Sequence, residues 1–584
     1  MFYPKLTEQR QQTLTTETFL GYDHNWKLSD GEFYDMENLT SDCYPLLAPR
    51  ARRGTVQALS GVQAICARDK LCWVQNQVLY INGASMEAYM PSVNITAGEK
   101  QLVSMGAYLC IFPDGIYFNT EDYSDNGYMG HENTVDAAQT PVDVSLCLAD
   151  GQALTLSYSQ AAQPESPSNG QYWLDTSGSL HTVKQWAEAS GQWVSVPTVY
   201  VKLAANGIGK GFRQYDGIEI SGLSGNEQLR KLNGSQILYG VDESSIVIVG
   251  LIDQTAEVTS GTVKTARRVP DMDFITECGN RLWGCKYGVA NGKTVNELYC
   301  CKLGDFKNWA CYQGVATDSW RASCGTDGKW TGAATLAGSP VFFKEDCFHR
   351  VYPSATGAHQ VVVQKCAGVQ SGSAKSLVVV DDRLYYKSRM GVCVYDGSLP
   401  QEIGGCFGPK LYANAAAGGV RGKYFISMKD EAHSWALFVY DTRKGLWHRE
   451  DSTHASEFAR VGDELYFLEN GTLKTVYGTA GTLDGPVEWM AETGIMTYAL
   501  VGKKYVSRIK LRMQLPKGSS VDFWVQYDSD GVWRHCGHIE GRGLRTFLLP
   551  VRPARCDHLK FRLTGKGEMK LFSLARVLEA GSDA

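Results

Sequence analysis

The sequence predicts an all-β protein, built as a β-propeller with small inserted β-modules and a C-terminal β-sandwich. Three observations predict this class. Short runs of aromatic and β-branched residues recur between Asp, Asn and Gly turns. Aromatic residues make up 11% of the 584-residue chain and Gly occurs 61 times, which favours strands joined by many turns. Near the C-terminus, apolar and basic residues alternate as they do in half-buried strands.

The clearest building unit lies at residues 375–397. A β-branched run at 377–380 meets a turn at Asp381 and Asp382, a second extended run follows at 384–386, and a third at 392–395 ends in Asp396 and Gly397. Strand runs at this even spacing, separated by turn residues, are typical of an antiparallel meander.

The same unit recurs along the chain with different residues. Each copy has an aromatic-rich strand, a turn with Asn, Asp or Gly, and a second strand, and the copies lie at 69–83, 108–119, 280–285, 422–451 and 463–478. A unit of roughly 40 to 50 residues that repeats with variation is the pattern of a β-propeller. Another antiparallel all-β fold, such as a sandwich, remains the alternative.

Length and residue order predict five segments. A chain of 584 residues is longer than a single hydrophobic core usually organises, so its length predicts about two to four domains. We expect an extended arm at 1–18, the first part of the propeller at 19–133, inserted β-modules at 134–264, the rest of the propeller at 265–484 and the sandwich at 485–584. The first strand after Arg50 is expected to pair with the last blade near 465–477 and close the ring.

Charge and cysteine usage restrict the partners and the compartment. The net charge of −5 creates no global attraction to nucleic acid or to an anionic membrane, and no apolar run approaches the length of a bilayer span. The odd number of 17 cysteines, many of them inside apparent strands and none in a CxxC pair, fits buried thiols in a reducing compartment. We expect the chain to fold in a cytoplasm, without nucleotide binding and without membrane insertion.

The predicted insertion and sandwich hold candidate glycan-binding residues. Aromatic side chains at exposed positions stack on sugars, although they more often fill cores. The candidates are Trp173, Trp186 and Trp193 in a hairpin at 170–196, and Trp533 in the sandwich.

The strand at 505–513 alternates apolar and basic residues, which predicts one buried face and one positively charged face. Such a face is either simply solvated or docks an acidic neighbour or an acidic glycan. The candidate interface residues are Arg508, Lys510, Arg512, Arg552 and Arg555.

A search for catalytic motifs finds none. The glycine-rich stretch at 207–211 lacks the phosphate-loop spacing, no GxSxG is present, and His and Cys do not fall at zinc-ligand spacing, so we expect no cofactor and no metal. Residues 323–330 and 529–533 are similar to the Asp-box turn of sialidases but depart from its order. A sialidase also needs an arginine triad and a Tyr-Glu pair, and the spacing does not select the available residues: Arg321, Arg350, Arg389, Tyr386 and Glu345.

The opening segment carries a family resemblance. Gly21, the Asp-Gly-Glu at 30–32, the Glu-Asn-Leu at 37–39 and the Pro-Arg-x-Arg-Arg-Gly at 49–54, together with the repeats at 280–285 and 304–309, resemble β-propeller structural proteins of tailed bacteriophages and prophages. The resemblance implies a non-enzymatic tail component, such as an adaptor, a nozzle-like protein or a tail tip. It also implies location in the virion tail and contacts with other tail proteins and with copies of itself in a ring.

Arg50, Arg52 and Arg53 are the candidate contact residues in such a ring, unless they cap the first blade. A carbohydrate-binding adhesin that contacts the host surface is the alternative function, and a propeller glycosidase is a third.

Overall fold

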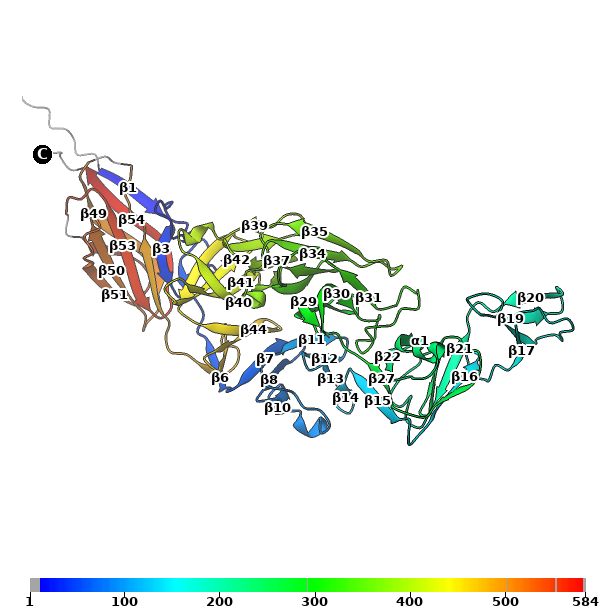
Figure 1. Ribbon diagram of the computed structural model, residues 1–584. Helices are drawn as coiled ribbons and strands as arrows, with labels where there is room; N and C mark the ends of the chain where they lie inside the picture. Colours follow the sequence, from blue (N-terminus) through cyan, green and yellow to red (C-terminus); the bar gives the residue numbers. More distant parts are fainter. Residues whose placement is uncertain (1–10, 291, 500–501, 552–553, 581–584) are drawn as a thin grey trace, which may run out of the picture.

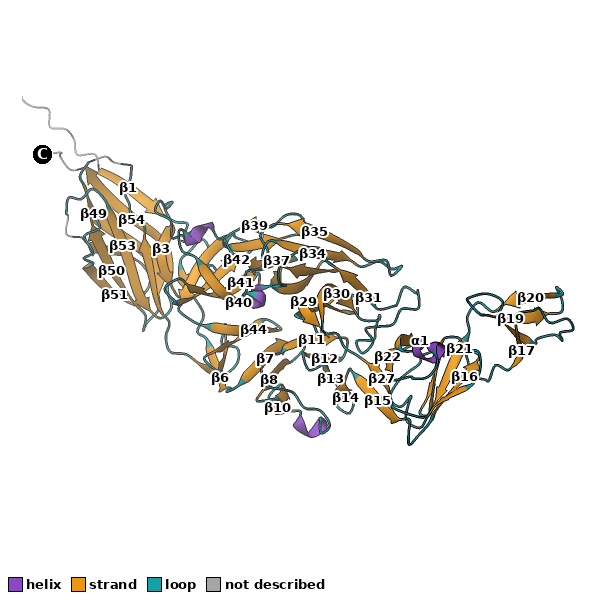
Figure 2. Ribbon diagram, viewed as in Figure 1, coloured by secondary structure: helices purple, strands orange, loops and turns teal. Residues whose placement is uncertain are grey.

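The computed structural model describes residues 11–290, 292–499, 502–551 and 554–580 (Figure 1). Nearly all regular structure is β-strand (Figure 2), and the described helices are one α-helix and three single 3-10 turns: α1 (Glu227–Lys231), η1 (Glu87–Tyr89), η2 (Ala374–Ser376) and η3 (Gly405–Phe407). The predicted all-β class with a β-propeller is confirmed. No helix in the described part of the chain is long and apolar enough to cross a membrane.

Seven antiparallel sheets in the described residues form the blades of the propeller. Blade 1 contains β7 (Val62–Ala67), β8 (Leu71–Gln75), β9 (Val78–Ile81) and β10 (Ala84–Ser85). Blade 2 contains β11 (Gln101–Met105), β12 (Tyr108–Phe112), β13 (Ile116–Asn119) and β14 (Asn126–Tyr128). Blade 3 contains β28 (Phe274–Glu277), β29 (Leu282–Ala290), β30 (Lys293–Cys300) and β31 (Trp320–Ser323). Blade 4 contains β32 (Gly332–Leu336), β33 (Ser339–Phe343), β34 (Cys347–Tyr352) and β35 (Gln360–Lys365).

Blades 5 to 7 complete the ring. Blade 5 contains β36 (Val378–Val380), β37 (Arg383–Lys387), β38 (Val392–Tyr395) and β39 (Gln401–Glu402). Blade 6 contains β40 (Tyr412–Val420), β41 (Lys423–Asp430), β42 (Trp435–Asp441) and β43 (Leu446–Asp451). Blade 7 contains β44 (Ala455–Val461), β45 (Glu464–Glu469), β46 (Thr472–Thr475), β6 (Gly54–Ala58) and β47 (Thr482–Leu483).

The ring is closed by a strand from the start of the chain. β6 pairs antiparallel with β46, in a register that sets Ala58 opposite Thr472 and Gly54 opposite Thr475. The inner strand β44 of blade 7 lies beside β7 of blade 1. This confirms the predicted closure and leaves the propeller without a free first or last blade.

Aromatic residues of the repeats fill the wedges between blades. Trp283 of blade 3 is fully buried in a cluster with Phe342 and Val351 of blade 4. Tyr385 of blade 5 stacks on Tyr424 of blade 6 with ring centroids 5.3 Å apart. Because burying each such side chain contributes about 1.5–3 kcal/mol, the recurring aromatic strands hold neighbouring blades together.

The insertion between β14 and β28 forms two nested units. Its larger unit has a core of aliphatic side chains between two sheets. The first sheet has the order β15 (His131–Asp136), β27 (Thr262–Arg267), β22 (Gly217–Ser221) and β23 (Gly234–Ile237). The second has the order β24 (Gly240–Asp242), β25 (Ser245–Val249), β21 (Tyr200–Ala204), β16 (Val142–Cys147) and β26 (Ala256–Val258). Between β16 and β21 lies a second sheet module, which Figure 1 places at the tip of the molecule: β17 (Leu156–Gln160), β18 (Tyr172–Asp175), β19 (Thr182–Ala187) and β20 (Gln192–Ser195).

Two sheets pack face to face around one apolar core at the other end of the molecule. One sheet has the order β1 (Gln11–Thr16), β54 (Lys570–Ala580), β49 (Lys504–Leu515) and β52 (Gly543–Pro550). The other has the order β2 (Gly21–Tyr22), β3 (Glu32–Glu37), β48 (Glu488–Thr493), β53 (Leu559–Lys566), β50 (Ser520–Tyr527) and β51 (Arg534–Glu540). The sandwich therefore contains strands from both ends of the chain.

This arrangement corrects two expected boundaries. Residues 11–16 of the expected arm form β1, which pairs along β54, while residues 1–10 lie outside the described residues. Residues 21–37 were expected in the propeller, but β3 pairs with β48 of the sandwich. The chain then passes through β4 (Leu39–Thr40) and β5 (Ala48–Pro49) and enters the propeller at β6. The alternation of these short strands does not reveal which distant strand completes their sheet.

Candidate binding site at the propeller axis

A hollow opens at the axis of the propeller, where the N-terminal ends of the inner strands meet. Its volume is about 660 Å³, and we call it the axial hollow. Its lining includes the following polar and aromatic residues: Glu99, Lys375, Asn414, Trp435, His454 and Ser456. They come from loops or strands of four different blades, so the hollow exists only when the ring is closed.

An ion-pair network crosses the axis beside the hollow. The Lys375 Nζ lies 2.6 Å from Glu99 Oε1 and 2.7 Å from Glu457 Oε1. Glu457 accepts a second hydrogen bond, of 2.6 Å, from the backbone N–H of Ile65 in blade 1. The pKa of Lys375 is raised, because attraction by Glu457 and Glu99 outweighs the lowering effect of burial. Lys375 therefore carries its charge at neutral pH and joins η2 to two other blades.

An aromatic surface forms one wall of the axial hollow. Trp435, at the start of β42, stacks on His454 with ring centroids 3.7 Å apart and an interplanar angle of 16°. Both side chains are half-buried. Burial lowers the pKa of His454, with Lys429 adding to this effect and Glu469 opposing it. A neutral imidazole stacked on an indole presents a flat, weakly polar face.

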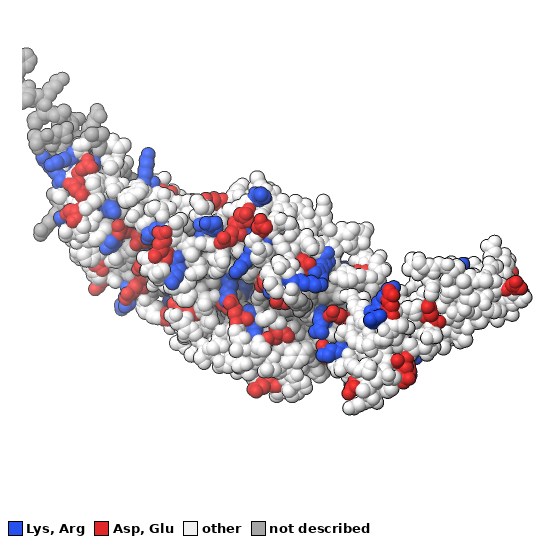
Figure 3. All heavy atoms as spheres, in the orientation of Figure 1, with Lys and Arg blue, Asp and Glu red and all other residues white. Residues whose placement is uncertain are grey.

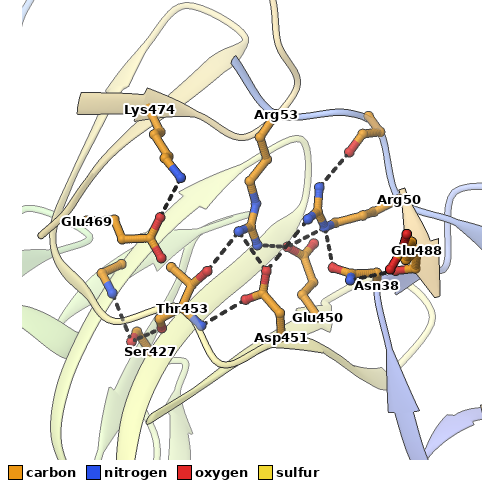
Figure 4. Close-up of polar contacts among 12 residues, drawn as sticks. Asn38, Arg50, Arg53, Ser427, Glu450, Asp451, Thr453, Glu469, Lys474 and Glu488 are labelled. Atoms are coloured by element: carbon orange, nitrogen blue, oxygen red, sulfur yellow. Dashed lines mark hydrogen bonds and ion pairs between the residues drawn. The ribbon is translucent and has the colours of Figure 1, made fainter. Parts of the chain in front are cut away.

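The three arginines expected to contact a neighbouring copy lie in different environments, and Figure 4 shows two of them, Arg50 and Arg53. The Arg53 side chain is buried and binds Glu450 Oε2 at 2.7 Å and Asp451 Oδ2 at 2.8 Å. Arg50 lies against the same two carboxylates at 3.7 and 3.6 Å and donates from Nε to Asn38 Oδ1 at 2.7 Å. Arg52 is exposed. Arg53 is thus unavailable to an external partner, and it instead fixes the entry of the chain into blade 7.

The basic residues of the sandwich are placed as the alternation predicts. Arg508, Lys510 and Arg512 are exposed on β49, while Ile509, Leu511 and Met513 are buried between them. Arg555 is also exposed, and Arg552 lies outside the described residues.

The three tryptophans of the insertion come together in the module at the tip. Trp193 packs against Trp173 and Trp186 with ring centroids 5.4 and 5.5 Å apart. Trp173 is only 3% exposed, so it belongs to the core of the module and offers no face to a sugar. Trp186 and Trp193 are half-buried. The tip that these strands form carries few charges on the face shown in Figure 3.

Trp533 is far from this cluster. It precedes β51, at the opposite end of the molecule in Figure 1. The guanidinium of Arg562 lies over its ring at 4.1 Å from the centroid. The four predicted stacking residues therefore do not make one surface.

The residues considered for a sialidase-type site are engaged separately. Arg321 binds Glu297, Arg350 donates to the hydroxyl of Tyr395, and Glu345 accepts from the backbone N–H of Ser371. Tyr386 donates to the carbonyl of Ala367. These contacts stabilise blades 3 to 5 and do not form a common anion site. Among the described residues, no group of three or more His, Cys, Asp or Glu could hold a metal ion.

The sequence pattern does not reveal the residues of the axial hollow. Glu99, Lys375 and Glu457 belong to parts of the chain that are about 80 to 360 residues apart, and each looks like an ordinary surface charge in its own repeat. The one available signal is their common position just before or within the first strand of a repeat, because these positions converge on the axis of a propeller.

Comparison with known proteins gives no family. The chain matches no protein-family model and no curated protein. Among solved structures it is similar to an exo-beta-1,3-galactanase from Phanerochaete chrysosporium, with 10% identity over 52% of this chain and 94% of that chain and a TM-score of 0.19. Apo AztD from Citrobacter koseri matches with 8% identity over 87% and 99% of the chains and a TM-score of 0.26. Trypanosoma rangeli sialidase matches with 9% identity over 69% and 87% and a TM-score of 0.16.

These matches correct one expectation. The sequence predicted a non-enzymatic tail component, whereas the matched structures include glycoside hydrolases and a sialidase, which are enzymes. On this comparison the prediction of a non-enzymatic tail component is wrong, and it is not carried further. At TM-scores this low the matches assign no activity to this chain. They do not bear on the resemblance to phage proteins, on partners or on location, which stay predictions.

Proposed function

We propose that the chain binds a carbohydrate in the axial hollow of the propeller. The observation that carries the proposal is the half-exposed stack of Trp435 on His454 beside the charged groups Lys375 and Glu99, all of which line one hollow. Sugars present apolar C–H faces and rings of hydroxyl groups, so they bind where a flat aromatic surface lies next to hydrogen-bond donors and acceptors.

The polar groups are suited to hydroxyl recognition. An ammonium has three N–H donors, and in the described part of the chain Lys375 uses two of them on Glu99 and Glu457. The third is left for a ligand oxygen. The exposed carboxylate of Glu99 and the amide of Asn414 add acceptors and a donor at the rim. The volume of about 660 Å³ lies within the range of about 300–1,000 Å³ typical of small-molecule sites and suits a short oligosaccharide.

A glycan array probed with the full-length chain tests this proposal. We expect binding to a restricted set of oligosaccharides that is lost in Lys375→Gln, which removes the charge from the wall of the hollow. Lys566→Gln is the matched control, because Lys566 forms a comparable exposed ion pair with Glu488 on the sandwich. An empty array, or equal loss in both variants, contradicts the proposal.

Glycoside hydrolysis at the edge of the axial hollow is a second candidate, favoured by the convergence of the Glu99 and Glu457 carboxylates on Lys375. Glu457 lines the two neighbouring hollows, which Lys375 also lines. Hydrolysis by a carboxyl pair needs one group protonated and one ionised. The Lys375 Nζ binds both carboxylates, so a substrate would have to displace it from one of them. Release of reducing sugar from an oligosaccharide that binds, abolished in Glu457→Gln, would establish this activity. Binding without release in the wild-type chain would exclude it for that sugar.

A further inference from the structure

The outer face of β49 presents an unpaired row of cations. Arg508, Lys510 and Arg512 alternate with buried residues on this strand, and none of the three forms an ion pair with a carboxylate among the described residues. Neighbouring positions of one face of a strand are about 6.6–6.8 Å apart, so the three charges form a regular line. Unlike paired arginines of the propeller such as Arg53, this line has no counter-charge in the part of the chain that the structure describes.

The surroundings of the line are uncharged on both sides. In β54, Ala575 and Ser573 lie opposite Lys510 and Arg512, and in β52 the residues opposite are Leu548 and Thr546. Leu548 is 62% exposed and Leu544, two pairs further along β52, is 54% exposed. The face is therefore a stripe of positive charge that borders exposed leucines.

β52 is also an edge strand. It ends its sheet, with β49 as its only hydrogen-bonded neighbour among the described strands, and six of its eight residues are exposed. In the residues that the structure describes, its outward backbone groups pair with no other segment. An edge with free N–H and C=O groups accepts an added strand, and natural proteins usually block such edges when they have no partner.

The line of charge continues into a groove. At the end of β49, Gln514 lies opposite Lys570, and both line a groove of about 580 Å³ between the sandwich and the propeller. Lys517 and Arg52 line the same groove, together with one carboxylate, that of Glu568. An elongated anionic ligand would therefore meet mainly positive charge from β49 through to the propeller.

We propose that this surface binds an acidic polypeptide segment in extended conformation, which adds to the edge of β52 and sets its carboxylates toward the cations of β49. The repeat of a β-strand matches the spacing of the cations, and the free edge supplies backbone hydrogen bonds that only a polypeptide uses. A single-stranded nucleic acid is disfavoured, because binding such a strand without sequence preference relies on stacked aromatic side chains, and the positions between Arg508 and Gln514 present none on this face. The proposal is independent of carbohydrate binding in the axial hollow.

Binding of poly-L-glutamate to the full-length chain, measured by fluorescence anisotropy at low salt, tests the proposal. We expect the variant R508S/K510S/R512S to bind at least about tenfold more weakly, because it loses three unpaired charges at the contact. The control K293S/K329S/K365S removes the same charge from exposed positions of the propeller and is expected to leave affinity unchanged. All six side chains are exposed, so neither variant disturbs a core.

Two further measurements separate a peptide site from a general polyanion site. On binding, the outward-facing backbone amides of residues 543–549 are expected to gain protection from hydrogen exchange, as an added strand requires. Heparin and a thymidine oligonucleotide are expected to bind more weakly than poly-L-glutamate. Equal affinity for the three polymers, unchanged exchange in β52, or an equal loss in the control variant would overturn the proposal.

Discussion

Arg53 and Glu450 form a buried ion pair of 2.7 Å that joins the chain just before β6 to the end of blade 6. Asp451 and Thr453 bind the other terminal nitrogen of the same guanidinium, each at 2.8 Å. Arg53 and Glu450 lie 397 positions apart in the chain. The closure of the propeller therefore depends on a polar contact as well as on strand pairing.

Replacing Arg53 by Met is expected to destabilise the propeller by about 3–5 kcal/mol, because it removes the nearest cation from the buried Glu450 and the partly buried Asp451 and leaves them only the longer contacts to Arg50. Arg52→Met, at the exposed neighbour, is expected to change stability by less than about 0.5 kcal/mol. Urea unfolding followed by hydrogen exchange of residues 54–58 measures the difference. Similar midpoints for the two variants would show that closure does not depend on Arg53.

Gly54 marks the point where β6 enters blade 7. A Cβ at this position would lie 2.1 Å from the carbonyl oxygen of Ala480 and 2.5 Å from the hydroxyl of Thr475. Gly54→Ala is therefore expected to weaken the pairing of β6 with β46 and to lower the melting temperature. Gly485→Ala is the control, since nothing lies within 4 Å of a Cβ there. Equal melting temperatures would mean that the strand shifts at no cost.

His448 predicts a loss of stability in mild acid. Burial, together with the charge of Lys423, lowers the pKa of this imidazole to about 3, although Asp441 and Asp42 oppose the shift. Between pH 6.5, the ordinary value, and pH 3 the unfolded chain binds a proton that the folded chain does not. The contribution of the neutral His448 to the free energy of unfolding is thus complete above pH 6.5 and falls by up to about 1.4 kcal/mol per pH unit below it.

Thermal unfolding between pH 7 and pH 5 measures this effect. The melting temperature of the wild-type chain is expected to fall as the pH is lowered, and that of His448→Gln is expected to fall less steeply. His433→Gln, at an exposed position, is expected to keep the wild-type slope. A His448→Gln slope as steep as that of the wild type would show that other groups cause the acid sensitivity.

Trp193 is expected to be the core residue of the module at the tip. It contacts Trp173, Trp186 and Tyr158. Truncation of a fully buried aromatic to Ala costs about 3–5 kcal/mol, and even part of this cost for the half-buried Trp193 is more than such a small sheet is expected to tolerate. Trp193→Ala is expected to unfold residues 156–195 and leave the propeller intact, as judged by hydrogen exchange. Unchanged protection of the module would instead favour a surface role for this residue.

The fold was predictable because its signals are local. The run of strands and turns around Tyr385 and Asp381 repeats often enough to indicate a propeller, and the alternation at Arg508, Ile509 and Lys510 indicates which face of β49 is buried. The partner of a strand is not a local property. Neither β1 nor β3 carries a mark of the C-terminal strand beside it, so the two-ended sandwich was missed.

The site was less predictable for the same reason. Lys375 and Glu457 meet only because seven blades close into a ring. Arg53 looked like a surface cation, since its sequence neighbours are Arg50 and Arg52, and only the position of Glu450 shows that it is buried. Spacing along the chain does not encode contacts across such separations.

Calorimetric titration of the full-length chain with an oligosaccharide that binds on the array tests the central proposal most directly. Trp435→Leu removes the aromatic wall of the axial hollow, and we expect at least about a tenfold loss of affinity, since stacking on such a face is worth about 1–2 kcal/mol beyond apolar contact. Trp26→Leu, at a side chain 79% exposed near the sandwich, is the control and is expected to bind as the wild type does. Full affinity in a folded Trp435→Leu variant would contradict a carbohydrate site at the propeller axis.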